Sequence, residues 1–193
     1  MIGGILVSRV TSVMYIIYNG IMFGGLKLSG KRIHVGKKCT SRIGNKVEIS
    51  PKGVLKIGFH FSALKNCRFL VRDEGELCIG DNVGLNTNCI IACHQRIEIG
   101  DDVMIGPNVC IYDHDHDFRE PEGIVARKYY CKPVKIGNRT WIGANVVILK
   151  GAEIGKDCVI AAGSIVNGKI PDNSILIQKR ESNIKEIIKI NVN

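Results

Sequence analysis

Aliphatic residues return every six positions along much of this chain. One run keeps this register without a slip at Ile136, Ile142, Ile148, Ile154, Ile160 and Val166. A shorter run stands at Ile99, Ile105 and Ile111, and looser pieces precede it at Val35, Ile43, Ile57, Ile79 and Leu85. A helical period of 3.6 residues fits none of them. The pattern predicts short strands joined at corners, with three strands closing a triangular coil of about 18 residues. We therefore expect an all-β solenoid.

The residues around each aliphatic position fit such a coil. Gly, Ala or Asn often follows it, at a corner where a large side chain would clash or a positive φ is needed. Small apolar residues such as Val103 and Val146 stand four positions later and would fill the interior. Six of the eight cysteines occupy core positions of this kind: Cys39, Cys67, Cys78, Cys89, Cys110 and Cys158. Their placement indicates reduced, buried thiols in a cytoplasmic protein rather than disulfides.

Both ends of the chain depart from the repeat. The solenoid is expected over residues 30–175, with a loop inserted at residues 113–134. Residues 1–29 are apolar-rich, with a three- to four-residue spacing that predicts an amphipathic helix packed on the solenoid. Contact of residues 1–28 with a membrane surface is the alternative. Residues 176–193 form a tail in which Ser182 to Ile190 predicts a short helix.

Charge and composition narrow the class of partner. The 193 residues carry a net charge of +9, which can attract nucleic acid, anionic lipid, acidic polysaccharide or a phosphorylated cofactor. We expect no nucleic-acid partner, because the chain has no zinc-finger spacing, aromatic RNA-binding motif or basic helix. Hydrophobic residues make up 45% of the chain and aromatic residues only 6%, which suits narrow β-layers built from Ile, Val and Ala.

The break in the repeat is the candidate for chemistry. Between Ile111 and Ile136 the period stops, and the inserted segment begins Asp113-His114-Asp115-His116-Asp117. A neutral imidazole titrates near pH 7 and can remove a proton from an attacking hydroxyl, while a carboxylate on its other nitrogen fixes the tautomer. Any of the three aspartates could supply that carboxylate. A solvated charged loop and a metal site are the alternatives.

The segment from Ile105 through Pro107-Asn108 to the two histidines resembles the hexapeptide-repeat acyltransferases, in the branch of galactoside, maltose and other sugar O-acetyltransferases. The resemblance covers roughly residues 30–175. It implies a left-handed parallel β-helix and a homotrimer with active sites at subunit interfaces. Counting from Pro107-Asn108 places the family's catalytic histidine on His116. Because Asp117 replaces the proline that often follows it, His114 remains the alternative base.

The same resemblance implies an acceptor site and bears on the metal alternative. Asn86 falls where relatives bind the acceptor, although it could equally be a corner asparagine in the left-handed conformation. Asp113, Asp115 and Asp117 are further candidates for acceptor contact. The fold also hosts zinc carbonic anhydrases, but the spacing of His94, His114 and His116 does not match their three-histidine site. We therefore expect no metal. His94 interrupts the register, either facing the cleft or, as we favour, forming an exposed bulge.

The donor implied by the resemblance is acetyl-CoA. The expected contacts are Trp141, Gly143, Ala144, Ala162, Gly163 and Asn167 along the pantetheine arm, and Lys179, Arg180 and Lys185 at the phosphates. Trp141 could instead be an outward anchor for the loop. These coils also stack as ordinary core, so their pattern alone does not establish binding.

Together these features predict an acyl-CoA-dependent O-acyltransferase, acting on a sugar or lipid-linked saccharide in surface-polysaccharide synthesis. It would work in the cytoplasm or peripherally at the inner face of the cell membrane. N-acetylation of an amino sugar or antibiotic is one alternative. A non-catalytic β-helix scaffold is the alternative from another class.

Overall fold

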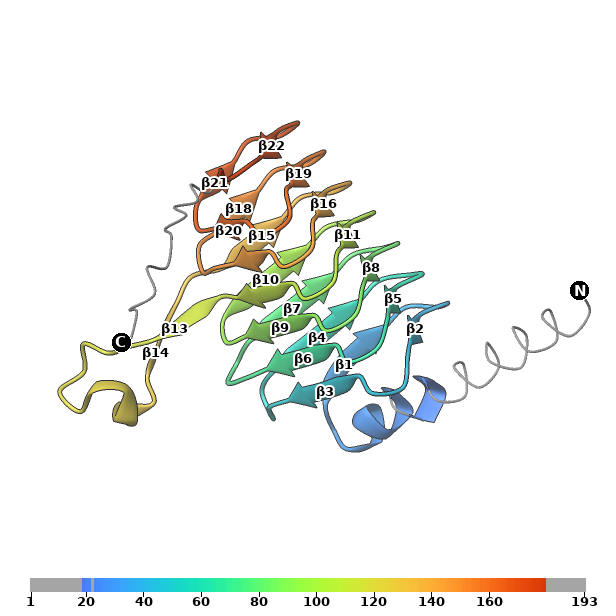
Figure 1. Ribbon diagram of the computed structural model, residues 1–193. Helices are drawn as coiled ribbons and strands as arrows, with labels where there is room; N and C mark the ends of the chain where they lie inside the picture. The colour runs from blue at the N-terminus through green and yellow to red at the C-terminus, as the bar shows by residue number, and fades with distance from the viewer. Residues whose placement is uncertain (1–18, 22, 180–193) are drawn as a thin grey trace, which may run out of the picture.

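The computed structural model describes residues 19–21 and 23–179, and within them the chain winds into a triangular stack of coils (Figure 1). Each coil contributes one strand to each of three parallel sheets, faces A, B and C, except the last described coil, which adds strands to faces A and B only. The parallel β-solenoid predicted from the six-residue period is confirmed. Residues 19–21 and 23–28 are helical and lie at the first coil. Residues 1–18 of the helical segment expected over residues 1–29, and the helix expected at 182–190, lie outside the described residues.

The strands are short and follow one another around the triangle. Face A holds β1 (Arg32–Val35), β4 (Val54–Ile57), β7 (Glu76–Ile79), β10 (Arg96–Ile99), β15 (Val134–Ile136), β18 (Glu153–Ile154) and β21 (Lys169–Ile170). Face B holds β2 (Thr40–Ser41), β5 (Ser62–Ala63), β8 (Gly84–Leu85), β11 (Met104–Ile105), β16 (Trp141–Ile142), β19 (Val159–Ile160) and β22 (Ile175–Leu176). Face C holds β3 (Lys46–Ile49), β6 (Arg68–Val71), β9 (Ile90–Cys93), β12 (Cys110–Tyr112), β17 (Val147–Ile148) and β20 (Ile165–Val166).

Coil length differs between the two halves. Lys135 pairs with Glu153, the predicted offset of 18 residues, whereas Arg32 pairs with Val54, an offset of 22. The early coils are longer because their strands on faces A and C have four residues instead of two or three. This explains why the six-residue period is loose in the first half of the chain.

The interior is a stack of aliphatic side chains with almost no exposed surface, such as Leu77, Ile111 and Ile148. Three inward assignments were wrong. Cys78 and Cys110 are half-buried because they alternate with inward neighbours on their strands. Ile43 is exposed, and Ser41 and Asn45 take the inner positions around it. These two polar side chains are hydrogen bonded to each other, and the buried Asn19 side chain accepts the Ser41 amide at 3.0 Å.

The corners show why glycine follows the aliphatic residue. A Cβ on Gly143 would lie 2.6 Å from the Ala162 nitrogen of the next coil, so close approach of backbones requires glycine there. The left-handed φ falls instead two residues later, at Asn108 and Asn145. The two asparagines stack in neighbouring coils, where the Asn108 side-chain amide donates a hydrogen bond to the Asn145 side-chain oxygen at 3.0 Å.

Candidate active site

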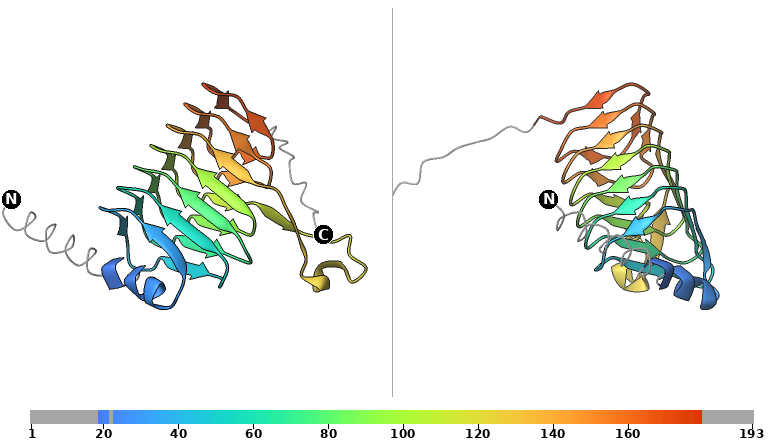
Figure 2. Two further views of the ribbon diagram at one scale, coloured as in Figure 1. Left: turned by 180° about the vertical axis from the view of Figure 1, so that it is seen from behind. Right: turned by 90° about the vertical axis from the view of Figure 1, so that its right-hand side faces the viewer.

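The inserted segment is a hairpin that leaves the solenoid at the corner between faces C and A (Figures 1 and 2). It follows β12 as β13 (His114–His116), passes through the 3-10 turn η1 (Gly123–Ala126) and returns as β14 (Tyr129–Cys131). The two strands are antiparallel, with His116 opposite Tyr129. The chain rejoins face A at Val134. The hairpin therefore carries both histidines of the predicted motif away from the repeat.

Asp113 anchors the hairpin at its base. Its side chain is fully buried, and its carboxylate accepts the backbone N–H groups of His94, Gln95 and Arg96 at 2.7 to 3.1 Å. A fourth contact joins Asp113 Oδ1 to His114 Nδ1 at 3.1 Å. Burial alone would raise the pKa of this carboxyl, but the bonds from His114 and the backbone amides outweigh it and hold the pKa below its ordinary value. Asp113 is thus an ionised group that faces the protein interior.

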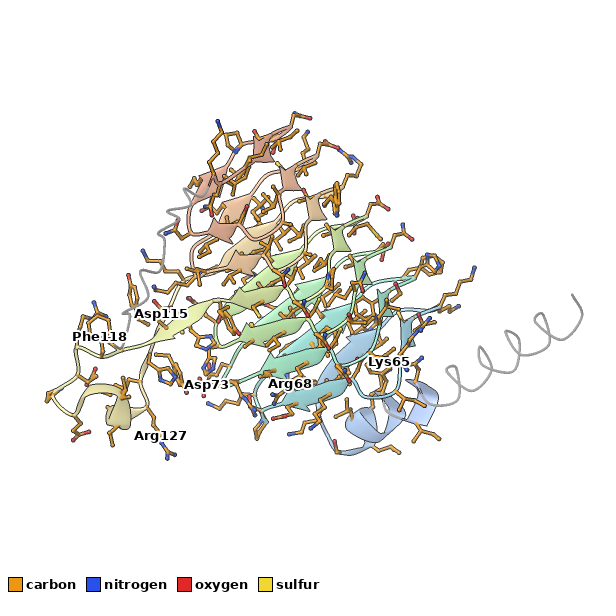
Figure 3. The ribbon with its side chains drawn as sticks, viewed as in Figure 1. Lys65, Arg68, Asp73, Asp115, Phe118 and Arg127 are labelled. Atoms are coloured by element: carbon orange, nitrogen blue, oxygen red, sulfur yellow. The ribbon has the colours of Figure 1, made fainter. Side chains whose placement is uncertain are left out.

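His94 belongs to the same cluster, and the expectation of an exposed bulge was wrong. Its side chain is only 9% exposed, and its ring lies 4.0 Å from the His114 ring. His94 Nδ1 lies 2.8 Å from Asp73 Oδ2. Burial lowers the pKa of His94 below its ordinary value, although the bond to Asp73 acts in the opposite direction. His94, which follows β9, therefore packs against the hairpin and is held by Asp73, which follows β6. Figure 3 shows Asp73 beside the base of the hairpin.

Tyr129 connects the three histidines. Its ring centroid lies 4.1 Å from that of His94, 5.3 Å from that of His114 and 4.9 Å from that of His116. No pattern in the sequence marked this tyrosine, because its role depends on the register of the hairpin. Among the described residues, no hydrogen bond to the His116 ring is present, and His116 is exposed. His116 therefore offers an accessible imidazole, whereas His114 is largely covered.

The other two aspartates of the motif pair with cations and not with histidine. Asp115 forms an ion pair with Lys150. Asp117 accepts two bonds from the Arg119 guanidinium, at 2.7 and 2.8 Å, which holds the pKa of Asp117 at about 2. Of the three candidate carboxylates, Asp113 alone bonds a histidine of the motif, and that histidine is His114. No group of three or more His, Cys, Asp or Glu side chains among the described residues is arranged to hold a metal.

The predicted acceptor and donor residues lie on other corners. Asn86 is exposed at the end of β8, and its side chain accepts the amide of Thr87 at 2.8 Å. Its φ is not positive; Asn88 takes the left-handed conformation instead. Trp141 is 58% exposed on face B, paired with Met104 below and Val159 above.

The remaining donor candidates follow face B. Gly143, Ala144, Ala162 and Gly163 form the corners between faces B and C, where the Gly163 amide donates to the Ala144 carbonyl at 2.8 Å. Asn167 and Lys179 are exposed near the last coils. Arg180 and Lys185 lie outside the described residues. The histidine hairpin and the donor candidates thus occupy two different corners of one protomer.

Of the hollows on face A, two lie along its fourth to seventh strands. One, of about 550 Å³, is lined by Lys135, Glu153, Lys156 and Lys169 among others, and the second, of about 430 Å³, by Arg96, Lys132 and Pro133. Neither includes His114 or His116. A single protomer therefore does not enclose the hairpin histidines in either hollow.

Comparison with known proteins assigns this architecture to a protein family. The profile of the bacterial transferase hexapeptide family (six repeats) matches residues 133–168. The putative lipopolysaccharide biosynthesis O-acetyl transferase WbbJ of Escherichia coli is 32% identical over 64% of this chain and 67% of its own length. The chain belongs to the hexapeptide-repeat transferase family. The fold is accordingly the left-handed β-helix of that family.

Two further relatives of the family define how far the likeness extends. The probable acetyltransferase Rv3034c of Mycobacterium tuberculosis is 34% identical over 84% of this chain but only 49% of its own length. A hexapeptide-repeat acetyltransferase of Vibrio cholerae, solved with acetyl coenzyme A, is 28% identical with a TM-score of 0.52, covering 74% of this chain and 64% of that one. The chain thus spans about half the length of some curated relatives that it matches.

Proposed function

We propose that this protein transfers an acetyl group from acetyl-CoA to a hydroxyl of a saccharide acceptor in surface-polysaccharide synthesis. The observation that carries the proposal is the histidine hairpin, set where the repeat of a hexapeptide transferase is broken. Support for the donor comes from the Vibrio cholerae relative solved with acetyl coenzyme A. Support for an O-linked saccharide acceptor comes from the name of the Escherichia coli relative.

His116 acts as the general base. Its neutral imidazole accepts the acceptor's hydroxyl proton as the oxygen attacks the thioester carbonyl. Collapse of the tetrahedral intermediate breaks the carbon–sulfur bond, and the imidazolium returns the proton to the departing thiolate. The products are an acetyl ester and free coenzyme A, and no covalent enzyme intermediate is needed. His116 is favoured over His114 because its ring is exposed, whereas Asp113 and two aromatic rings surround His114.

The active site is shared between subunits of a homotrimer. The hairpin leaves the corner between faces C and A, whereas Trp141 and the small residues of the donor coils follow face B and its corner with face C. A general base must come within hydrogen-bond reach of the reacting hydroxyl. Packing one protomer's hairpin against a neighbour's donor corner brings the two halves together, and cyclic symmetry repeats that contact three times.

The test is release of coenzyme A thiol from acetyl-CoA with a panel of saccharide acceptors. Wild type, His116→Ala and His114→Ala are compared, with His34→Ala as the matched control, because His34 is an exposed histidine on β1. We expect acceptor-dependent release that falls by about 10² to 10⁴ in His116→Ala and not in His34→Ala. Equal activity in wild type and His116→Ala, with loss only in His114→Ala, would move the base to His114.

A further inference from the structure

Cations are concentrated at one end of the solenoid. Residues 19–72 contain twelve Lys or Arg and a single acid, Glu48. The rest of the described chain, residues 73–179, contains eleven Lys or Arg and fifteen Asp or Glu. The net charge of the protein therefore comes from the helical segment and the first two coils.

These cations encircle the end of the solenoid instead of following one side. In the first coil, Arg32 lies on face A, Lys37 at the corner before face B, and Lys46 on face C. Lys27 adds a further charge on the helical segment. A linear polyanion would be matched by a stripe along one face or groove. A ring of charge around an end matches a flat anionic surface that lies across it.

Three exposed lysines at this end have no acidic partner among the described residues. Lys52 and Lys56 pair with Glu74 and Glu76 of the following coil, and Glu48 takes up Arg68 and Arg72. In contrast, Lys27, Lys37 and Lys46 are exposed and have no ion-pair partner within residues 19–21 and 23–179. Their charge is available to an external ligand.

Apolar side chains accompany the unpaired lysines. Ile21 is 71% exposed and Leu28 is 92% exposed on the helical segment, and Ile43 is exposed at a corner of the first coil. The eighteen residues that precede Asn19 contain no acidic residue and one basic residue, Arg9, and are otherwise mostly apolar in sequence. Exposed aliphatic residues interspersed with lysines are the composition of segments that bind at a membrane interface. Exposed aliphatic side chains would add nothing to the binding of an acidic polysaccharide.

We infer that the N-terminal end of the solenoid docks on an anionic phospholipid bilayer, with the lysines of the helical segment and the first coil at the headgroups and Ile21 and Leu28 inserted between them. Docking concerns where the protein works and does not depend on the reaction proposed above. In the homotrimer, rotation about the threefold axis keeps all three ends on the same side, so three weak contacts add. No helix within residues 19–21 and 23–179 is long and apolar enough to cross a bilayer.

The test is co-sedimentation of the full chain with vesicles of phosphatidylcholine, alone or with phosphatidylglycerol as the minority lipid. The first variant combines Lys27→Gln, Lys37→Gln and Lys46→Gln. The matched control combines Lys135→Gln, Lys156→Gln and Lys169→Gln, which removes the same charge from exposed positions near the other end. A third variant combines Ile21→Gln and Leu28→Gln.

We expect wild type to bind vesicles that contain phosphatidylglycerol and not phosphatidylcholine alone. The first variant should lose at least a hundredfold in partition coefficient, because three lysines at about fivefold each already give about a hundredfold for one subunit of the trimer, and the control about twofold or less. The third variant, which removes the apolar side chains of the helical segment, should also bind more weakly. Equal binding to both vesicles, equal loss in the two lysine variants, or tight binding to dextran sulfate without vesicle binding would overturn the inference. Thiol release with a soluble acceptor and no vesicles should match wild type in both lysine variants, which separates docking from the reaction.

Discussion

Asp113 Oδ1 lies 3.1 Å from His114 Nδ1, and the same carboxylate holds three backbone amides of the preceding coil. One buried group therefore sets both the origin of the hairpin and the orientation of its first histidine. Since His116 is two residues further along the same strand, its position depends on this anchor. The site is built outward from a carboxylate that substrate does not have to touch.

Asp113→Asn tests the anchor. The amide keeps one acceptor but turns an N–H₂ group toward buried backbone donors, so we expect a loss of about 2 to 4 kcal/mol in the free energy of unfolding. Activity should fall in parallel, because the hairpin loses its fixed origin. Asp115→Asn is the control, because its ion pair with Lys150 is half exposed and should cost less than about 1 kcal/mol. The measurement is urea unfolding at neutral pH. A stability of Asp113→Asn equal to that of Asp115→Asn would contradict the anchoring role.

The lowered pKa of His94 predicts how the free energy of unfolding depends on pH. Because burial lowers its folded-state pKa, the unfolded chain binds a proton first as the pH falls. The free energy of unfolding should therefore be highest above the ordinary histidine pKa of about 6.5 and decline as the pH falls below it, levelling below the folded-state pKa. His94→Gln should flatten this slope between about pH 7 and 5. The test compares the urea midpoints of wild type and His94→Gln across that pH interval. Identical slopes in the two proteins would count against a buried neutral imidazole.

Much of the fold could be predicted because the solenoid repeats one local rule. The register from Ile136 to Val166 marks inward residues directly, and the structure confirms them. The rule failed where polar residues replace the aliphatic ones, as at Ser41 and Asn45, which leave Ile43 outside. It also carried no information on the hairpin, because the pairing of His116 with Tyr129 and the burial of Asp113 depend on contacts between distant segments. The motif marked the two candidate histidines, but only the three-dimensional arrangement separates the covered His114 from the exposed His116.

Gly143→Ala tests whether corner glycines are required by close packing. The added Cβ would lie 2.6 Å from backbone nitrogen and 2.9 Å from a backbone oxygen of the next coil, and neither atom can rotate away. We expect a loss of about 1 to 3 kcal/mol. Gly168→Ala is the matched control, because nothing lies within 4 Å of its added Cβ and its φ is not positive. That control should be neutral or up to about 1 kcal/mol more stable. Thermal unfolding of the two variants side by side gives the comparison.

Trp141→Ala separates a donor contact from a structural one. Trp141 is exposed and pairs only along the strand ladder, so its removal should change the free energy of unfolding by less than about 0.5 kcal/mol. If the indole packs on acetyl-CoA, KM for the donor should rise about tenfold while kcat falls less. Ile175→Ala, on the same outward column two coils further, is the control. Steady-state kinetics at varied donor concentration would show the split, and an unchanged donor KM would instead favour a role as an outward anchor.

A mixed-trimer experiment tests whether the base and the donor corner come from different subunits. His116→Ala removes the base, and Ala162→Trp places a large ring at an exposed donor corner without entering the core. Each variant alone should be nearly inactive. In trimers assembled from equal amounts of both, an interface works when the subunit that keeps His116 meets a neighbour that keeps Ala162. Random assembly makes about a quarter of the interfaces intact, so about a quarter of wild-type activity should return. A site contained in one protomer would give no recovery at any ratio, because every subunit then carries one of the two defects.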